Sequence, residues 1–170
     1  IHYSAKPGQS ILFIYRRQEE TLQALVAAGL PVRAYGRAWS RHPYDILRTK
    51  QFKDSGVPAG RDIDRSEAYG IMASSPATLN IHNNQDGFTM RTFEAPGVGA
   101  LQVIDRPDVD RYYIPGEEVL VYESIDELIE ICTRIFRDPK WARQIREAGQ
   151  KRTLAEHTFD QRVKILEQLW

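Results

Sequence analysis

The sequence has a single cysteine and no excess of charge of either sign. Cys132 stands alone, so no disulfide can form within the chain and nothing argues for secretion. The 170 residues hold 23 Lys and Arg against 23 Asp and Glu, so no overall field attracts nucleic acid or a membrane surface. No apolar run reaches the length of a membrane span, and no signal peptide is visible. We therefore expect a cytoplasmic protein that does not bind nucleic acid and does not cross a membrane.

Signatures of metal, dinucleotide and nucleophile chemistry are also missing. The four histidines are scattered along the sequence, at His2, His42, His82 and His157, and no cysteine pair exists. The sequence therefore shows no set of metal ligands. Asp108-Val109-Asp110 has the letters of a cluster that holds a metal-bound diphosphate, but we interpret it as a solvated loop. No G-x-G-x-x-G follows a strand, and no Ser/His/Asp or Cys/His arrangement can be placed. We expect no metal and no cofactor.

What is present fits one globular domain. With 42% hydrophobic and 27% charged residues, a chain of this length can bury a real core. Arginine outnumbers lysine; it suits bidentate contacts with phosphate or carboxylate, although an arginine-rich genome produces the same bias. The chain starts at Ile1 rather than Met, which suggests an excised domain or fragment. We expect residues 1–170 to form a single domain.

Buried strands alternate with amphipathic helices in the first part of the chain. Residues 11–15 form a continuous apolar run, typical of a strand buried on both faces. A helical stripe follows and stops at Gly29, and residues 31–36 predict a second strand. Such a β-α-β unit implies parallel strands with a right-handed crossover. Residues 37–65 show no clean period, and we interpret them as irregular, with one short helix or strand.

The later part of the chain predicts further strands and a closing run of helices. Strands are expected within 78–82, 101–105 and 119–122. The expected helices span residues 66–74, 124–136, 140–156 and 158–170, with Ser66, the Ser124/Glu127 capping box and the Thr158/Gln161 pair as their caps. The alternation argues for an α/β fold, a Rossmann-like parallel sheet with helices on both faces that ends in C-terminal helices.

The stretch from Thr78 to Asp105 carries the candidate site. A polar turn leads into a short helix whose first amides, at Gly87, Phe88 and Thr89, have no intrahelical partners. Free amides and the helix dipole predict an anion site there, and Gly87 lets a phosphate approach the backbone closely. Glu94, two turns further along, can accept hydrogen bonds from two ribose hydroxyls, or it is simply solvated. Asp86 can cap the helix as well as contact a ligand.

Other residues converge on the same edge of the predicted sheet. Arg16 and Arg17 follow the first strand and would stand in the first turn of the next helix. Cations are mildly unfavourable in a first helical turn, which favours contact with a ligand over a solvated helical turn. His82 closes a strand at this edge, where we expect a sugar contact or a partly exposed ring. Arg91 lies one turn before Glu94, which predicts an i,i+3 ion pair.

A family resemblance rests on this stretch. Asp86-Gly87-Phe88-Thr89, four residues, then Glu94-Ala95 resembles the E-G-F-G-x4-E-A segment of retaining glycosyltransferases with the GT-B fold, which contains the E-x7-E motif. Here Asp86 replaces the first Glu and Thr89 the last Gly. Downstream segments look like the group 1 glycosyltransferases related to spore-maturation proteins: Gly97–Asp105, Pro115–Glu118, and Glu156–Thr158 with Arg162. The likeness covers most of residues 60–170.

The resemblance implies the C-terminal, nucleotide-sugar-binding half of a GT-B enzyme. In such enzymes the first acid contacts the donor sugar and the second the ribose, which assigns these contacts to Asp86 and Glu94. Basic residues early in the domain neutralise the donor diphosphate, a role for Arg16 and Arg17. The segment 59–61 aligns loosely with the loop that meets the base. The expected chemistry is metal-independent sugar transfer from a nucleotide diphosphate donor, with retention.

Two consequences and two alternatives follow. The N-terminal GT-B domain is expected as a partner outside this chain, and the isolated chain is predicted to be inactive. A non-catalytic α/β ligand-binding or signalling module is one alternative. A receiver-like module needs an acidic pair after its first strand, and Arg16 and Arg17 stand there instead. Half of a nucleotide-sugar epimerase is the other alternative.

Tyr112 and Tyr113 are expected to pack rather than to stack on a ligand.

Overall fold

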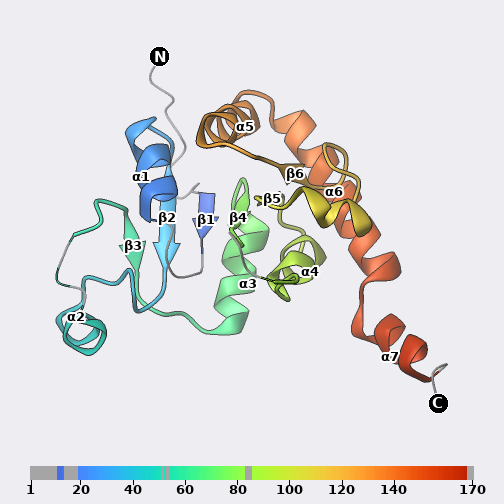
Figure 1. Ribbon diagram of the computed structural model, residues 1–170, viewed down its shortest axis with the longest axis horizontal. Helices are drawn as coiled ribbons and strands as arrows, with labels where there is room; N and C mark the ends of the chain where they lie inside the picture. Colours follow the sequence, from blue (N-terminus) through green and yellow to red (C-terminus); the bar gives the residue numbers. More distant parts are fainter. Residues whose placement is uncertain (1–10, 14–18, 51, 53, 83–85, 168–170) are drawn as a thin grey trace.

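The computed structural model describes residues 11–13, 19–50, 52, 54–82 and 86–167. Within these residues, the strands form one sheet in which every neighbouring pair is parallel, in the order β3-β2-β1-β4-β5-β6 (Figure 1). The strands are short: β1 (Ile11–Phe13), β2 (Val32–Tyr35), β3 (Ala59–Gly60), β4 (Thr78–Asn80), β5 (Gln102–Ile104) and β6 (Leu120–Val121). The predicted Rossmann-like sheet is confirmed.

Helices connect the strands and close the chain. They are α1 (Glu19–Ala27), α2 (Pro43–Thr49), α3 (Arg65–Ser74), α4 (Arg91–Gly97), the 3₁₀ helix η1 (Pro107–Arg111), α5 (Ile125–Arg137), α6 (Pro139–Glu156) and α7 (Phe159–Glu167). The last three form the predicted run of C-terminal helices. No helix in the described part of the chain has the length and apolar character needed to cross a bilayer.

Alternation along the strands places helices on both faces of the sheet. Leu79 and Val103 belong to the largest apolar cluster, together with residues of α1 and α5. The neighbouring Asn80 points to the other face, where its amide donates to Thr92 of α4 at 3.1 Å. Figure 1 shows α5 on one side of the strands β4 to β6 and α4 on the other. The sheet is therefore buried between two helical layers, as its apolar strands require.

The strand order reverses between β1 and β4. The chain runs outward from β1 through β2 to β3, then returns to the middle at β4 and runs outward again to β6. In open parallel sheets, a ligand binds outside the carboxyl ends of the strands at such a reversal. Residues 14–18 follow β1 and residues 81–90 follow β4. The connections that carry the predicted acids and arginines thus begin at this reversal.

Local capping signals decide where several helices begin. The Ser124 hydroxyl accepts the Glu127 N–H at 3.2 Å, as predicted, while the Glu127 carboxylate accepts the N–H of Glu123 at 2.8 Å. The predicted cap of α3 is wrong. Asp64 caps this helix, accepting from the N–H of Glu67 at 2.8 Å and from the hydroxyl of Ser66 at 2.7 Å. A carboxylate two residues earlier outcompetes the serine hydroxyl.

The segment 37–65 holds more structure than the sequence indicates. It contains both α2 and β3, not one short element. The seven-residue α2 leaves Tyr44 and Leu47 59% and 72% exposed, so its apolar residues mark no buried stripe. Helix α7 is described to Glu167; the rest of the predicted helix, residues 168–170, lies outside the described residues.

Candidate functional site

The ends of β4 and β5 are tied together by His82 and Asp105. The backbone N–H of His82 donates to both carboxylate oxygens of Asp105, at 2.8 and 2.9 Å. The imidazole Nε2 accepts the N–H of Thr89 at 3.3 Å, which assigns the ring proton to Nδ1. This Nδ1 lies 3.5 Å from Asp105 Oδ1. Asp105 thus fixes His82, and the His82 ring in turn holds the far end of the turn that follows β4, at Thr89.

The expectation of a partly exposed histidine is wrong. His82 is 4% exposed overall, and its side chain is fully covered. Two hydroxyls approach its Nε2 at 3.4 Å, those of Thr89 and Thr92, and the ring packs edge-on against Phe88. In this arrangement the imidazole faces protein, so it acts on the site by holding the turn. The predicted sugar contact of His82 stays a prediction.

The predicted start of the helix at Gly87 to Thr89 is also wrong. Helix α4 begins at Arg91, and its N-cap Met90 makes no side-chain capping bond. The amide of Thr89 is bound to the His82 ring rather than open, and Gly87 adopts a left-handed conformation with φ +71°. A left-handed residue cannot continue a right-handed helix. Asp86 is therefore not a helix cap but an exposed residue in a bend.

Arg106, just after β5, holds the turn at Gly87 and Phe88. Its Nη1 donates to the Gly87 carbonyl at 3.2 Å, and its guanidinium lies 4.8 Å from the centroid of the Phe88 ring. The same group binds Asp108 through two hydrogen bonds of 2.7 Å, which lower the pKa of Asp108. Asp108 is thus a positioning partner of Arg106, not the solvated loop residue that the sequence predicted.

An aromatic cluster supports the other side of Phe88. The Phe88 ring contacts Tyr112 edge-on at 5.4 Å between centroids, and Tyr112 contacts Phe93 in the same way at 5.2 Å. The Tyr112 carbonyl lies 3.1 Å from His157 Nε2 at the junction of α6 and α7. Tyr113 is fully buried, and its hydroxyl bonds with Thr153 at 2.8 Å. The predicted packing role of both tyrosines is confirmed.

Glu94 lies in the first turn of α4, not two turns along the helix. Its Oε1 accepts the hydroxyl of Tyr69 at 2.7 Å. Its Oε2 lies 3.6 Å from Arg91 Nη1, so the predicted i,i+3 ion pair is confirmed. The Glu94 side chain is 18% exposed, which rules out a freely solvated glutamate. The carboxylate is held in place while part of it still reaches solvent.

Most of the predicted site residues lie on one connection of the chain. Asp86, Gly87, Phe88, Thr89 and Glu94 lie on the connection from β4 through α4, with His82 at its start. Arg16 and Arg17 lie outside the described residues. Among the described residues, no group of three or more His, Cys, Asp or Glu side chains could hold a metal ion.

Sequence reasoning missed Asp105, Arg106 and Tyr69. The first two follow a predicted buried strand, and the rule that placed His82 at the ligand edge applies equally to them. That rule could therefore have identified both residues. Tyr69 carries no such signal, because its contact with Glu94 joins residues 25 positions apart.

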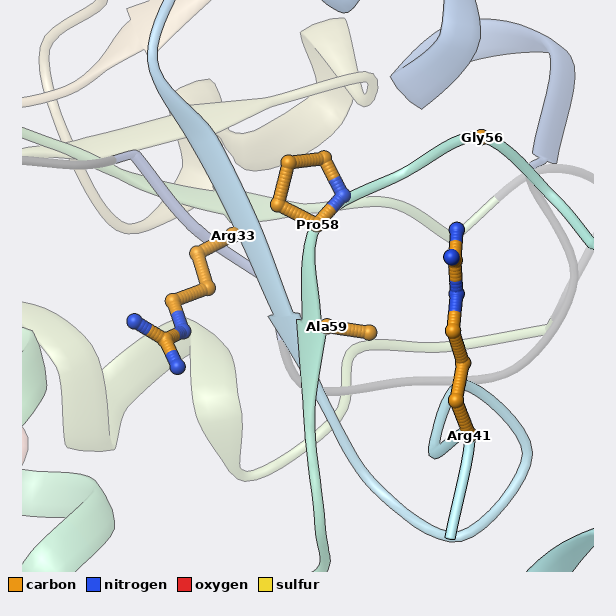
Figure 2. Close-up of a pocket in the computed structure, with 5 residues that line it drawn as sticks. All are labelled: Arg33, Arg41, Gly56, Pro58 and Ala59. Atoms are coloured by element: carbon orange, nitrogen blue, oxygen red, sulfur yellow. The ribbon is translucent and has the colours of Figure 1, made fainter.

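A shallow hollow lies beside β2 and β3, the last two strands at one lateral end of the sheet. It is lined by Arg33, Arg41, Gly56, Pro58 and Ala59. Figure 2 shows that the two arginine side chains lie on different sides of β3 and do not converge. Arg41 is paired with Asp54. The hollow therefore offers no joint anion site, and it is separate from the turn after β4.

Comparisons with known proteins identify relatives of this chain. A family model described as "Glycosyl transferase-like" matches residues 16–168. No curated protein matches the chain. Among solved structures, TarM superposes with a TM-score of 0.69 at 10% identity, over 99% of this chain and 36% of TarM. HepE from Anabaena, solved with UDP-glucose, gives 0.69 at 14% identity, over 95% and 48%.

A third similar structure is a single domain. It is the C-terminal domain of the group 1 glycosyl transferase LpcC from Francisella tularensis, with a TM-score of 0.63 at 15% identity, over 90% of this chain and 88% of that domain. At such identities the likeness shows the fold alone. The chain spans less than half of the length of TarM and of HepE.

Proposed function

The chain belongs to the glycosyl transferase-like family, and from this premise we propose that it is the donor-binding domain of a GT-B glycosyltransferase. The donor is a nucleoside diphosphate sugar, bound outside the carboxyl ends of β1 and β4. One observation carries the proposal: the strand order reverses between these two strands, and the connection that follows β4 carries both predicted acids. The relation to spore-maturation proteins stays a prediction.

The proposed roles follow the position of each side chain. Asp86 is exposed in the bend and is assigned to the donor sugar. Glu94 is held at the edge of solvent and is assigned to the ribose. The turn at Gly87 to Thr89, held by His82 and Arg106, is assigned to the diphosphate. Its backbone conformation differs from the open helix start that the sequence predicted, but its place beside the strand ends supports the same ligand.

The proposed chemistry is electrostatic. Charge grows on the diphosphate as the sugar leaves, and fixed cations and amide dipoles stabilise that charge without proton transfer. Arg16 and Arg17, which follow β1 in the sequence, are the proposed cations, with Arg17 in the catalytic role. Retention of configuration is proposed from the E-x7-E-like spacing of Asp86 and Glu94. The family match argues against the signalling-module alternative.

We propose that a second domain completes the active site. Small-molecule sites bury most of their ligand and often lie between domains, whereas the turn after β4 offers one surface. The chain also spans only 36% of TarM and 48% of HepE, which leaves room in those proteins for a facing domain. The acceptor is assigned to that domain.

Calorimetric titration tests the proposal. We expect the chain to bind one or more of UDP, GDP, dTDP and ADP, with UDP the first to try because HepE was solved with UDP-glucose. Glu94→Gln should weaken binding by about 1–3 kcal/mol, the cost of losing a hydrogen bond to a charged group. Glu130→Gln on the exposed side of α5 is the control and should bind normally. Absence of binding to all four nucleotides would refute the proposal; full affinity in Glu94→Gln would remove Glu94 from the site.

A further inference from the structure

The carboxylate of Glu94 is held from a neighbouring helix. Tyr69 lies on α3, and its hydroxyl donates to Glu94 Oε1 at 2.7 Å. A hydrogen bond to an ionised carboxylate is short and about twice as strong as a neutral one. Partial burial and the adjacent Glu94 raise the pKa of Tyr69, so the phenol keeps the proton that it donates. One of the two carboxylate oxygens is thus already engaged.

A second contact between the same helices holds the other side of Glu94. Met72 follows Tyr69 by one turn of α3, and Arg91 Nη1 approaches its sulfur at 3.7 Å. The same Nη1 lies 3.6 Å from Glu94 Oε2. Oε1 is therefore turned toward α3 and Oε2 toward Arg91, so both oxygens have defined positions before any ligand arrives. Oε2 lies beyond hydrogen-bonding distance of Arg91 and remains the better acceptor for a ligand hydroxyl.

We propose that Tyr69 is a positioning residue that presets the Glu94 carboxylate to receive the ribose hydroxyls of the donor. The inference rests on the proposed function, because it needs Glu94 to contact ribose. A free glutamate side chain loses considerable rotamer freedom when it is fixed by a ligand. If Tyr69 fixes the side chain beforehand, that entropy is not lost on binding, and affinity rises without a new contact.

The test uses Tyr69→Phe, which removes the hydroxyl and keeps the ring. With the nucleoside diphosphate that binds best, we expect affinity to fall about 3- to 10-fold, because part of the rotamer freedom of Glu94 must then be lost on binding. With the 2′,3′-dideoxy analogue of that nucleotide, the parent chain and the variant should bind equally. In the double variant with Glu94→Gln, the loss should not exceed that of Glu94→Gln alone.

Tyr113→Phe is the matched control, since it also removes a tyrosine hydroxyl from a hydrogen bond, here a buried one, but should leave the preference for ribose over dideoxyribose unchanged. Full affinity of Tyr69→Phe, in a chain whose Glu94→Gln variant binds weakly, would overturn the positioning role alone. Equal losses for the ribose and dideoxy nucleotides would assign Tyr69 a structural role instead. Full affinity of Glu94→Gln would refute the ribose contact, and the role of Tyr69 with it.

Discussion

At the scale of single residues, the turn after β4 depends on Gly87. Its φ of +71° lies in the left-handed region, and among the described residues no atom beyond its own chain neighbours lies within 4 Å of where a Cβ would be. The position thus has room for a side chain, but its backbone conformation costs free energy for any L residue. Sequence reasoning assigned the need for glycine to close approach of a phosphate. In the structure the backbone conformation alone already requires it.

We predict that Gly87→Val lowers the free energy of unfolding by about 1–2 kcal/mol, the penalty for a left-handed β-branched residue. Gly87→Asn should cost less, because asparagine tolerates this conformation. Urea denaturation of the two variants beside the parent measures both. The valine variant should also bind nucleoside diphosphate less tightly, since the turn is distorted. Equal stability of the two variants would show that the turn relaxes out of the left-handed conformation.

At the scale of elements, helix α6 packs unusually closely against the loop before β6. A Cβ added at Gly149 would lie 2.3 Å from the backbone carbonyl oxygen of Glu118. Such an oxygen cannot move without moving the loop that carries Val119, a buried member of the cluster beneath the aromatic residues of the site. Gly149 is therefore present for close approach, despite the cost of glycine in a helix.

Gly149→Ala is accordingly expected to destabilise the protein. Overpacking costs about 1–3 kcal/mol and should exceed the gain of about 1 kcal/mol in helix propensity. Gly70 provides a matched control in α3, because in the described part of the chain no atom outside its own helical turn and chain neighbours lies within 4 Å of the position that a Cβ would take there. Gly70→Ala should stabilise the protein by about 0.5–1 kcal/mol. Thermal or urea unfolding of both variants decides the matter, and a stabilised Gly149→Ala protein would contradict the close contact.

At the scale of the whole molecule, the core contains a thiol and two phenol groups that stay protonated when the chain is folded. Burial raises the pKa of Cys132 and that of Tyr113 to about 12 each, and it also raises the pKa of Tyr122. The unfolded chain releases these protons near the ordinary values of about 8.5 for cysteine and 10 for tyrosine. The stabilisation is complete below about pH 8.5 and is lost as the pH rises toward the native values.

We therefore predict that the urea midpoint of unfolding falls progressively between about pH 8.5 and pH 11. Tyr122→Phe should make this fall shallower, because it removes one of the groups that ionise only in the unfolded chain. Measuring the midpoint at several pH values for both proteins tests the prediction. An unchanged slope in Tyr122→Phe would mean that its hydroxyl ionises in the folded protein as easily as in the unfolded one.

The whole chain should bind a donor without transferring sugar. One surface leaves the donor solvated and the acceptor unplaced, and both water exclusion and orientation contribute to catalysis. We predict weak binding of nucleoside diphosphates, with no acceptor-dependent turnover by residues 1–170. Assays of sugar-donor consumption with and without sugar acceptors test this. Efficient acceptor-dependent transfer would show that the chain contains a complete active site.

The architecture and the region of the site could be predicted from the order of the residues. Apolar runs and helical stripes recur within a few residues, and caps such as Ser124 with Glu127 join neighbours along the chain, so these features are visible locally. The predicted parallel strands have their carboxyl ends at one edge of the sheet, which places the turn after β4 at a ligand edge, whereas the point at which the strand order reverses is seen only in the structure. The acidic pair of Asp86 and Glu94 lies in that turn and the helix after it.

The way in which the site is held depends on contacts that exist only in the folded chain. Contacts between distant residues bury His82 against Asp105, clamp Gly87 with Arg106 and aim Glu94 with Tyr69. These partners lie 23, 19 and 25 positions apart, beyond the reach of any helical or strand period. The first two pairs meet because the parallel strands bring separate loops to one edge of the sheet, and the third pair joins the helices α3 and α4. The start of α4 differs from the predicted one because Gly87 is left-handed and the His82 ring, in the same connection, binds the Thr89 amide that the sequence left open.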